Sequence, residues 1–246
     1  SKSLLITMDL HKIGYMSCNP AIGGIGKGQL VKEIDALGGE MAKAADNCGI
    51  QFRILNRSKG HAVRSSRAQI DRDLYLKYMQ SVARKTKNLD LLEGCVEELI
   101  VKSKTIKGVR LTDGRIVKSK AVVLAPGTFL NGLIHIGLTH EPGGRLGDPP
   151  SLGLSENLKS FGFNVSRLKT GTTPRLDGRT IRFSKLRKQT GDTPVSPFSF
   201  STEKIKSKQI PCFLTYTNRK THRIIKDNLG RSPLYTGKIQ STGVRY

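Results

Sequence analysis

The sequence predicts an α/β fold, and three observations lead to that prediction. A glycine-rich loop runs straight into a helical pattern at residues 29–37, where apolar side chains recur at one-turn spacing. An antiparallel meander is indicated over residues 96–119, where Asp113-Gly114 is a strong hairpin signal. Ala121 to Leu124 form a continuous apolar run that ends in a Pro-Gly turn. Such a run is typical of a strand buried on both faces of a sheet.

The remaining elements follow in chain order. A first strand is predicted within Lys2–Thr7, and Leu89–Leu92 is a second short strand. Asp71 can cap a helix that continues to about Lys85. The apolar face expected for this helix consists of Leu74, Tyr75, Tyr78, Met79 and Val82. The face expected for the helix after the glycine-rich loop consists of Leu30, Val31, Ile34 and Leu37. The meander strands are expected at Val96–Val101, Lys107–Thr112 and Arg115–Ser119.

The amino-acid composition changes beyond Arg167. Positive charge rises, and threonine and proline cluster around Pro174, where we place a boundary. We therefore expect two domains, residues 1–173 and residues 174–246. The second is predicted to be α+β, with a strand at Cys212–Tyr216 and a short helix at Thr221–Leu229.

The glycine-rich loop is the first candidate site. Gly23, Gly24, Gly26 and Gly28 surround Lys27 just before the helical pattern. Glycines let backbone N–H groups approach a ligand, and a helix N-terminus adds partial positive charge, so the loop suits a phosphate or pyrophosphate. Its spacing matches neither the P-loop nor the G-x-G-x-x-G dinucleotide fingerprint. The alternative is an ordinary loop-to-helix turn with a solvated lysine.

The charge of the chain favours a polyanionic partner. Lys and Arg number 42 against 19 Asp and Glu, which gives a net charge of +23. From residue 166 to residue 246 the counts are 18 and 4. Phosphate neutralisation dominates nucleic-acid affinity, so we favour nucleic acid over mere solubility. Aromatic residues of this part could stack on bases, although most are expected in the core: Phe183, Phe198, Phe200, Phe213, Tyr216 and Tyr235.

The four cysteines form no C-x-x-C pair and have no histidine at zinc spacing, so a reducing compartment and no metal site are expected. Cys48, Cys95 and Cys212 are interpreted as small buried hydrophobic residues. Cys18 lies just before the glycine-rich loop, where the positive end of a helix would favour a thiolate. No apolar run approaches the ~20 residues of a membrane span, so no membrane association is expected.

The stretch from Met16 to Gly28 resembles the signature of the glucose-inhibited division protein A (MnmG/GidA) family, flavoproteins that modify the wobble uridine of certain tRNAs. Further similar blocks lie at residues 49–53, 58–60, 68–72, 126–132, 143–151, 167–171, 231–235 and 243–246. The resemblance implies a Rossmann-like FAD-binding domain of the two-dinucleotide-binding-domain flavoprotein type, with an antiparallel β-meander and an inserted, NAD- and tRNA-associated α+β domain. The family's FAD fingerprint would lie upstream of Ser1 and more sequence would follow Tyr246, so we expect both domains to be incomplete.

The resemblance also implies site residues. The turn at Gly127 and Thr128 would lie against the flavin nucleotide, and ligands of open α/β sheets do sit beyond the carboxyl ends of strands. Val96 and Ser151 match FAD-contacting positions, although Ser151 alone is equally a helix N-cap, with Gly162 as the stop of that helix. Arg245 begins the NAD-associated block and could meet NADH phosphate or tRNA, or be a plain surface arginine. Arg145 and Asp148 could form a surface ion pair.

The implied chemistry uses FAD, NADH as electron donor and methylenetetrahydrofolate as one-carbon source. The carbon goes to C5 of uridine 34, and ammonium or glycine completes an aminomethyl or carboxymethylaminomethyl group, together with the GTPase partner MnmE. A homodimer is expected, in the cytoplasm or, for a eukaryotic relative, in the mitochondrion. Uracil C5 is a poor nucleophile, and a thiolate that adds at C6 is the usual remedy, so Cys18 is the candidate nucleophile.

Two other functions stay open at this point. One is a catalytically inactive, basic RNA-binding fragment. The other is a general FAD/NAD oxidoreductase without an RNA substrate. Bound flavin would exclude the first, and salt-dependent tRNA affinity would exclude the second.

Overall fold

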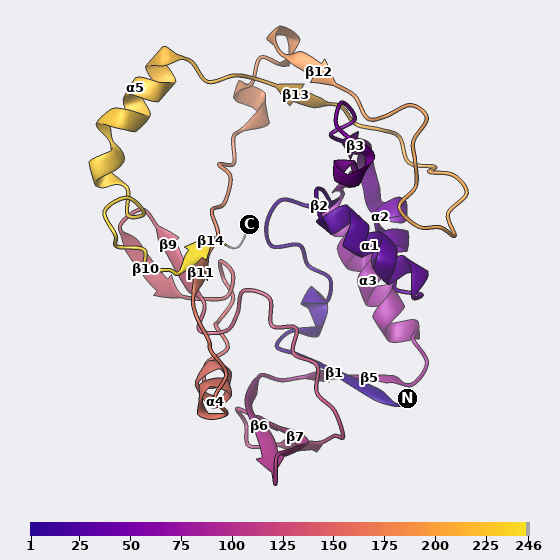
Figure 1. Cartoon of the computed structure of the whole chain (residues 1–246), viewed down its shortest axis with the longest axis vertical. Coiled ribbons are helices and arrows are strands. Elements are labelled where there is room, and N and C mark those ends of the chain that lie inside the picture. Colours follow the sequence, from indigo (N-terminus) through magenta and orange to yellow (C-terminus); the bar gives the residue numbers. More distant parts are fainter. Residues whose placement is uncertain (245–246) are drawn as a thin grey trace. The chain divides into compact units, whose positions relative to one another are not determined.

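A computed structural model describes residues 1–244 (Figure 1), and the chain divides into two units. Unit 1 comprises Ser1–Leu10, Asp90–Gly171 and the described residues from Thr217 onward. Unit 2 comprises His11–Leu89 and Thr172–Tyr216. Each unit is therefore assembled from separate stretches of sequence. The functional division at residues 1–173 and 174–246 stays a prediction.

Unit 2 is built on an antiparallel three-stranded sheet with helices packed against it. The strand order is β2 (Ala21–Gly23), β4 (Ser65–Ile70) and β3 (Gly49–Leu55). The helices are α1 (Lys27–Ala36), α2 (Met41–Cys48) and α3 (Arg72–Lys85). The buried core contains Ile22, Val31, Ala42, Ala44, Ala45, Cys48, Phe52, Ala68, Ile70, Tyr75 and Phe198. Small alanines on α2 let the helices approach the sheet closely.

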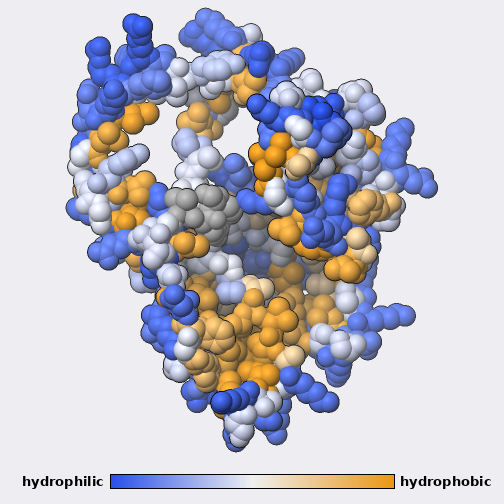
Figure 2. All heavy atoms as spheres, in the orientation of Figure 1, coloured by the Kyte–Doolittle hydropathy of each residue, from blue (hydrophilic) through white to orange (hydrophobic). Residues whose placement is uncertain are grey.

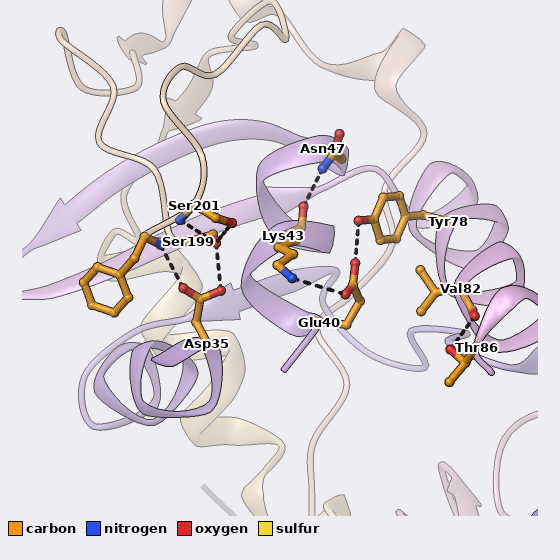
Figure 3. Close-up of polar contacts among 10 residues, drawn as sticks. Asp35, Glu40, Lys43, Asn47, Tyr78, Val82, Thr86, Ser199 and Ser201 are labelled. Carbon is orange, nitrogen blue, oxygen red and sulfur yellow. Dashed lines mark hydrogen bonds and ion pairs between the residues drawn. The ribbon is translucent and has the colours of Figure 1, made fainter. Parts of the chain in front are cut away.

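Helix α3 begins and ends as predicted. The Asp71 carboxylate accepts hydrogen bonds from the N–H groups of Asp73 and Leu74, both at 3.0 Å, which satisfies two of the unpaired donors of the first turn. Tyr75 and Ala83 are buried, whereas Leu74 of the expected apolar face is exposed. Tyr78 is half-buried and its hydroxyl donates to Glu40 at 2.6 Å (Figure 3), so polar contacts complete this face of the helix.

Helix α1 forms where expected, but the predicted apolar face is wrong. Val31 is buried, whereas Leu30, Ile34 and Leu37 are exposed. The buried face instead contains Gly28, Val31 and Asp35. Asp35 turns inward because its carboxylate accepts hydrogen bonds from the Ser199 hydroxyl and the Phe200 N–H, both at 2.8 Å (Figure 3). A buried polar contact, which periodicity does not detect, decides the orientation of this helix.

The second stretch of unit 2 is anchored to the first by buried carboxylates. Asp46 on α2 accepts hydrogen bonds from the N–H groups of Phe198 at 2.8 Å and Ser199 at 2.9 Å. Lys32 on α1 donates to the Phe198 carbonyl at 3.0 Å. These bonds hold the Phe198 ring fully buried in the core. The same stretch contains the antiparallel pair β12 (Arg187–Gln189) and β13 (Cys212–Leu214).

The expectation that most aromatic residues beyond residue 166 lie in the core is wrong. Of the six, Phe198 is buried and Phe213 is half-buried. The others are exposed: Phe183, Phe200, Tyr216 and Tyr235. Their rings lie on loops and short elements, where few neighbouring side chains are available to cover them.

Unit 1 contains the predicted meander. Its strands are β6 (Val96–Lys102), β7 (Thr105–Leu111) and β8 (Ile116–Lys118), antiparallel in that order. Asp113 accepts from the Arg115 N–H at 3.0 Å and Gly114 has φ +87°, so the Asp-Gly pair makes the turn as its sequence indicates. The first and second predicted strands also form, and β1 (Ser3–Thr7) pairs with β5 (Leu89–Glu93).

The predicted buried strand at Ala121–Leu124 is wrong. These residues form no strand, and Val123 is 91% exposed. A strand buried on both faces needs partners on both sides for its backbone groups, and none of the described strands pairs with this run. Leu4, Leu5 and Ile116 of the same unit are exposed too, and Figure 2 shows apolar surface gathered around β5 and β6.

The rest of unit 1 consists of short elements. The helices are α4 (Leu154–Ser160) and α5 (Arg219–Asp227), the second close to the predicted helix and capped by the Asn218 side chain. The hairpin β9 (Leu133–Ile136)–β10 (Thr139–Pro142) is antiparallel, and β11 (Leu168–Lys169) pairs in parallel with β14 (Gly243–Val244). Among the described residues, no helix combines the length and apolar character needed to cross a membrane.

Cys48, in the core of unit 2, makes the stability of the fold depend on pH in the alkaline range. Burial of its thiol, assisted by the Asp71 carboxylate, raises the pKa of Cys48 from 9.0 to about 11. The folded chain therefore keeps this proton while the unfolded chain loses it, so stability present below pH 9 is lost as the pH rises toward 11. We expect a loss of about 2 kcal/mol between pH 8 and pH 10.5 from this group alone.

Urea unfolding of the wild-type protein and of Cys48→Ala at these two pH values measures the loss. The variant is less stable at both values because of its cavity, but its stability should depend less on pH. Parallel decreases in the two proteins would contradict the assignment to Cys48.

Candidate functional site

The glycine-rich loop of unit 2 joins β2 to α1. Gly23, Gly24 and Gly26 have φ values of +85°, +101° and +75°, a backbone region that side chains with a Cβ rarely adopt. Gly26 is the N-cap of α1, and no side chain caps the first turn. The N-cap therefore provides no side-chain acceptor for the first turn of α1, although the Gly28 N–H donates to the Gly24 carbonyl at 2.7 Å.

The four glycines serve two different purposes. A Cβ at Gly23 would lie 2.2 Å from the Ser66 carbonyl, and one at Gly28 would lie 2.3 Å from the Ser65 hydroxyl. These two glycines are therefore needed so that β4 can pack against the loop. A Cβ at Gly24 or Gly26 would meet nothing within 4 Å. Gly24 is nevertheless buried, and its N–H donates to the Ser66 carbonyl at 2.8 Å, whereas Gly26 is exposed, so Gly26 is the glycine whose backbone a ligand can approach.

Cys18 and Lys27 lie on either side of the strand that leads into this loop. Cys18 is half-buried in the turn before β2, and Lys27 is the exposed first residue of α1. Strand β2 and the glycine turn stand between the cysteine and the helix. The Pro20 carbonyl accepts hydrogen bonds from the Ile70 N–H at 2.7 Å and the Gln69 amide at 3.1 Å, which fixes the backbone near Cys18 on β4.

The other candidate cofactor residues lie together in unit 1. The Thr128 hydroxyl donates to the Gly144 carbonyl at 2.7 Å. The Ser151 N–H donates to the Phe129 carbonyl at 2.8 Å, so the loop at 143–151 is tied to the turn at 127–132. The Cys95 thiol donates to the Ser151 hydroxyl at 3.8 Å, which brings the adjacent Val96 into the same group.

Ser151 is not the N-cap of α4, contrary to the sequence interpretation. The N-cap is Gly153, with φ +86°, and Gly162 ends the helix region as expected. Ser151 lies two residues before this cap. It is buried where its backbone forms a β-bridge with Leu130. Gly127, by contrast, is exposed with φ +59°, and a Cβ there would meet nothing within 4 Å.

Arg145 and Asp148 contribute more than the surface ion pair that the sequence suggests. Their side chains are only 15% and 8% exposed, and Nε lies 2.5 Å from Oδ2. The Arg145 guanidinium also lies over the Phe129 ring, 5.6 Å from its centre. This pair holds the 143–151 loop in shape beside Thr128 and Ser151. The short R-x-x-D spacing inside a glycine-rich loop is the sequence signal for it.

The family model of glucose inhibited division protein A matches residues 1–246. The chain belongs to this family. It is 56% identical over 245 residues to the tRNA uridine 5-carboxymethylaminomethyl modification enzyme MnmG of Thermodesulfovibrio yellowstonii, and equally to the enzyme of that name from Geobacter sulfurreducens. Each comparison covers 100% of this chain and 39% of the relative. The chain thus spans about two-fifths of the length of these curated relatives.

Solved structures of the glucose inhibited division protein A family have the same fold. Aquifex aeolicus GidA in its form I crystal superposes with a TM-score of 0.89 at 49% identity, over 100% of this chain and 42% of that chain. The form II crystal gives 0.87 at 50% identity, over 94% and 39%. The α/β fold expected from the sequence is therefore that of GidA.

The candidate residues of this family member fall into two groups. Cys18 and the residues from Gly23 to Gly28 belong to unit 2, and Val96, Gly127, Thr128 and Ser151 belong to unit 1. Arg245 lies outside the described residues. The roles of all these residues in catalysis or cofactor binding stay predictions.

Proposed function

We propose that the protein carrying this chain is an FAD-dependent enzyme that adds a carboxymethylaminomethyl or aminomethyl group to C5 of uridine 34 in tRNA. The observation that carries the proposal is the match of the family model to residues 1–246. The relative named tRNA uridine 5-carboxymethylaminomethyl modification enzyme MnmG is 56% identical over 245 residues, which is 100% of this chain. NADH would donate electrons and methylenetetrahydrofolate the carbon. We also propose that the enzyme acts together with the MnmE GTPase, forms a homodimer and is located in the cytoplasm.

The residues present fit a flavin dinucleotide. Gly26 offers exposed backbone at the start of a helix whose N-cap provides no side-chain hydrogen bond, which suits a phosphate group. In unit 1, Gly127 is open in the same way, beside the hydroxyl groups of Thr128 and Ser151. When bound, FAD supplies the redox chemistry that no side chain can supply.

The chain's own residues then have separate tasks. The exposed backbone at Ile25 and Gly26 holds a phosphate, and Lys27 adds positive charge beside it. The Cys18 thiolate adds to C6 of the uracil, which forms a C–S bond and moves the electrons of the C5–C6 double bond toward C5 and O4. C5 can then form its new bond to carbon. Loss of the C5 proton afterwards expels the thiolate and restores the double bond.

A second candidate function is RNA binding without flavin chemistry. It is favoured by helix α5, whose Arg219, Lys220 and Arg223 are exposed with no acidic residue in the first turn. Lys226 continues this basic series. Such a helix can contact several phosphates of an RNA backbone.

Purification followed by a visible spectrum and a tRNA shift assay at 50 and 200 mM salt tests both functions. We expect bound flavin and a tRNA affinity that falls at least tenfold with salt. Nucleoside mass spectrometry should detect modified uridine 34, and the same tRNA with cytidine at position 34 is the control. Tight RNA binding without flavin would favour the second candidate. Flavin without RNA affinity would indicate a general oxidoreductase, and the absence of both would overturn the proposal.

A further inference from the structure

Positive charge gathers around the β3–β4 hairpin of unit 2. Arg53 and Arg67 are directly opposite each other in the two strands. Like charges that face each other across a sheet destabilise it unless something neutralises them. The Nε atom of Arg53 is buried and has no hydrogen-bond partner among the described residues. The adjoining cavity, of about 10 Å³, has room for roughly one water molecule and not for a larger ligand.

The loop after β3 adds further cations and a much larger pocket. Arg57 and Arg64 line a pocket of about 380 Å³ together with Ile54. Lys59, on the same loop, is exposed. Arg57 forms an ion pair with Asp192 at 2.8 Å, which neutralises one of these charges. The loop therefore keeps a positive excess beside an open pocket.

Arg64 is held in place by neutral acceptors. Its Nε donates to the Lys59 carbonyl at 3.3 Å, its Nη2 donates to the Arg57 carbonyl at 2.9 Å, and its Nη1 contacts His61 Nδ1 at 3.4 Å. A guanidinium has five N–H groups, so one remains on each terminal nitrogen. Arg64 is thus a held cation that keeps one further N–H on each terminal nitrogen, and both can donate to phosphate oxygens.

We propose that the pocket of Ile54, Arg57 and Arg64 binds a phosphate group, either of a free phosphate compound or of an RNA backbone. Two arginines with donors to spare match the two to four oxygens that a phosphate presents. The volume exceeds what a phosphate alone requires, and the Ile54 side chain gives an apolar wall for the group that the phosphate carries. The site is separate from the flavin and uridine chemistry proposed above, and its RNA alternative rests on the tRNA substrate of that proposed function.

Titration with three probes tests the site: inorganic phosphate, adenosine monophosphate and a short RNA hairpin. The double variant Arg57→Gln/Arg64→Gln should bind at least about tenfold more weakly whichever probe the wild type binds. For the hairpin, the slope of log K against log salt should fall by between about one and two. Arg175→Gln, an exposed arginine elsewhere in unit 2, is the matched control and should change affinity less than about twofold.

The probes also identify the source of the phosphate. Binding of phosphate or the mononucleotide assigns the pocket to a small molecule, and loss confined to the hairpin assigns it to the RNA backbone. Equal affinity of wild type and double variant for every probe overturns the proposal, as does the absence of binding to all three. Arg64→Lys keeps the charge but loses the paired donors. It should weaken binding of the probe about threefold. If the double variant does not fold, this single variant tests the proposal instead.

Discussion

Replacing Asp46 with alanine is expected to lower the free energy of unfolding by about 4 kcal/mol and the urea midpoint by about 2 M. The carboxylate accepts hydrogen bonds from two buried backbone N–H groups, those of Phe198 and Ser199. Without it, both donors remain buried and unpaired, at a cost of about 1–3 kcal/mol each. The turn that carries the Phe198 ring into the core also loses its anchor. Equilibrium urea unfolding followed by circular dichroism measures the effect.

Two variants separate the hydrogen bonds from other effects at this position. Asp46→Asn keeps one accepting oxygen, so we expect it to lose about half as much stability as the alanine variant. Asn47→Ala removes a neighbouring exposed side chain on the same helix and should change stability by less than about 0.5 kcal/mol. If Asp46→Ala and Asn47→Ala were equally stable, the anchoring role of Asp46 would be refuted.

Cys18→Ala is expected to slow the modification of uridine 34 at least about 10³-fold, with tRNA affinity unchanged within about twofold. Under the proposed function, the variant keeps every group that contacts RNA phosphates but has no thiolate to add to C6. Quantification of the modified nucleoside in single-turnover reactions measures the rate, and a shift assay measures affinity.

A covalent readout distinguishes a nucleophile from a merely structural cysteine. RNA with 5-fluorouridine at position 34 cannot lose its C5 substituent as a proton, so the C–S bond to the enzyme should persist in a denaturing gel. The wild type and Cys212→Ala should form this adduct, and Cys18→Ala should not. An adduct in Cys18→Ala would show that another residue is the nucleophile.

The elements that the sequence predicts well are those whose signals are local. Helix α3 follows from Asp71, whose carboxylate bonds residues two and three positions away. The meander follows from Asp113 and Gly114, which need only their immediate neighbours to make the turn. Capping and turn chemistry act over a few residues, so they can be recognised without knowledge of the tertiary fold.

The failures concern contacts that lie far apart in the sequence. Asp35 and Asp46 meet partners 165 and 152 residues away, and no local pattern marks either as a buried acceptor. The continuous apolar run at Ala121–Leu124 likewise indicates a buried strand but does not tell whether a neighbouring strand is there to pair with it, and none of the described strands does. Within the candidate site, glycine spacing identifies the loop, yet only geometry separates Gly23 and Gly28, which packing requires, from Gly26, which is exposed.

The discontinuous make-up of unit 2 has a consequence for biosynthesis. Helices α1 and α2 leave the ribosome about 150 residues before Phe198, which fills the space between them and the sheet. At the usual speed of translation this interval lasts on the order of ten seconds. During that time we expect Asp46 and the apolar side chains around Phe52 to lack the contacts that Phe198 provides in the finished fold. Such exposed apolar surface on a nascent chain is what chaperones bind, so we expect this part of unit 2 to be covered only when the later stretch arrives.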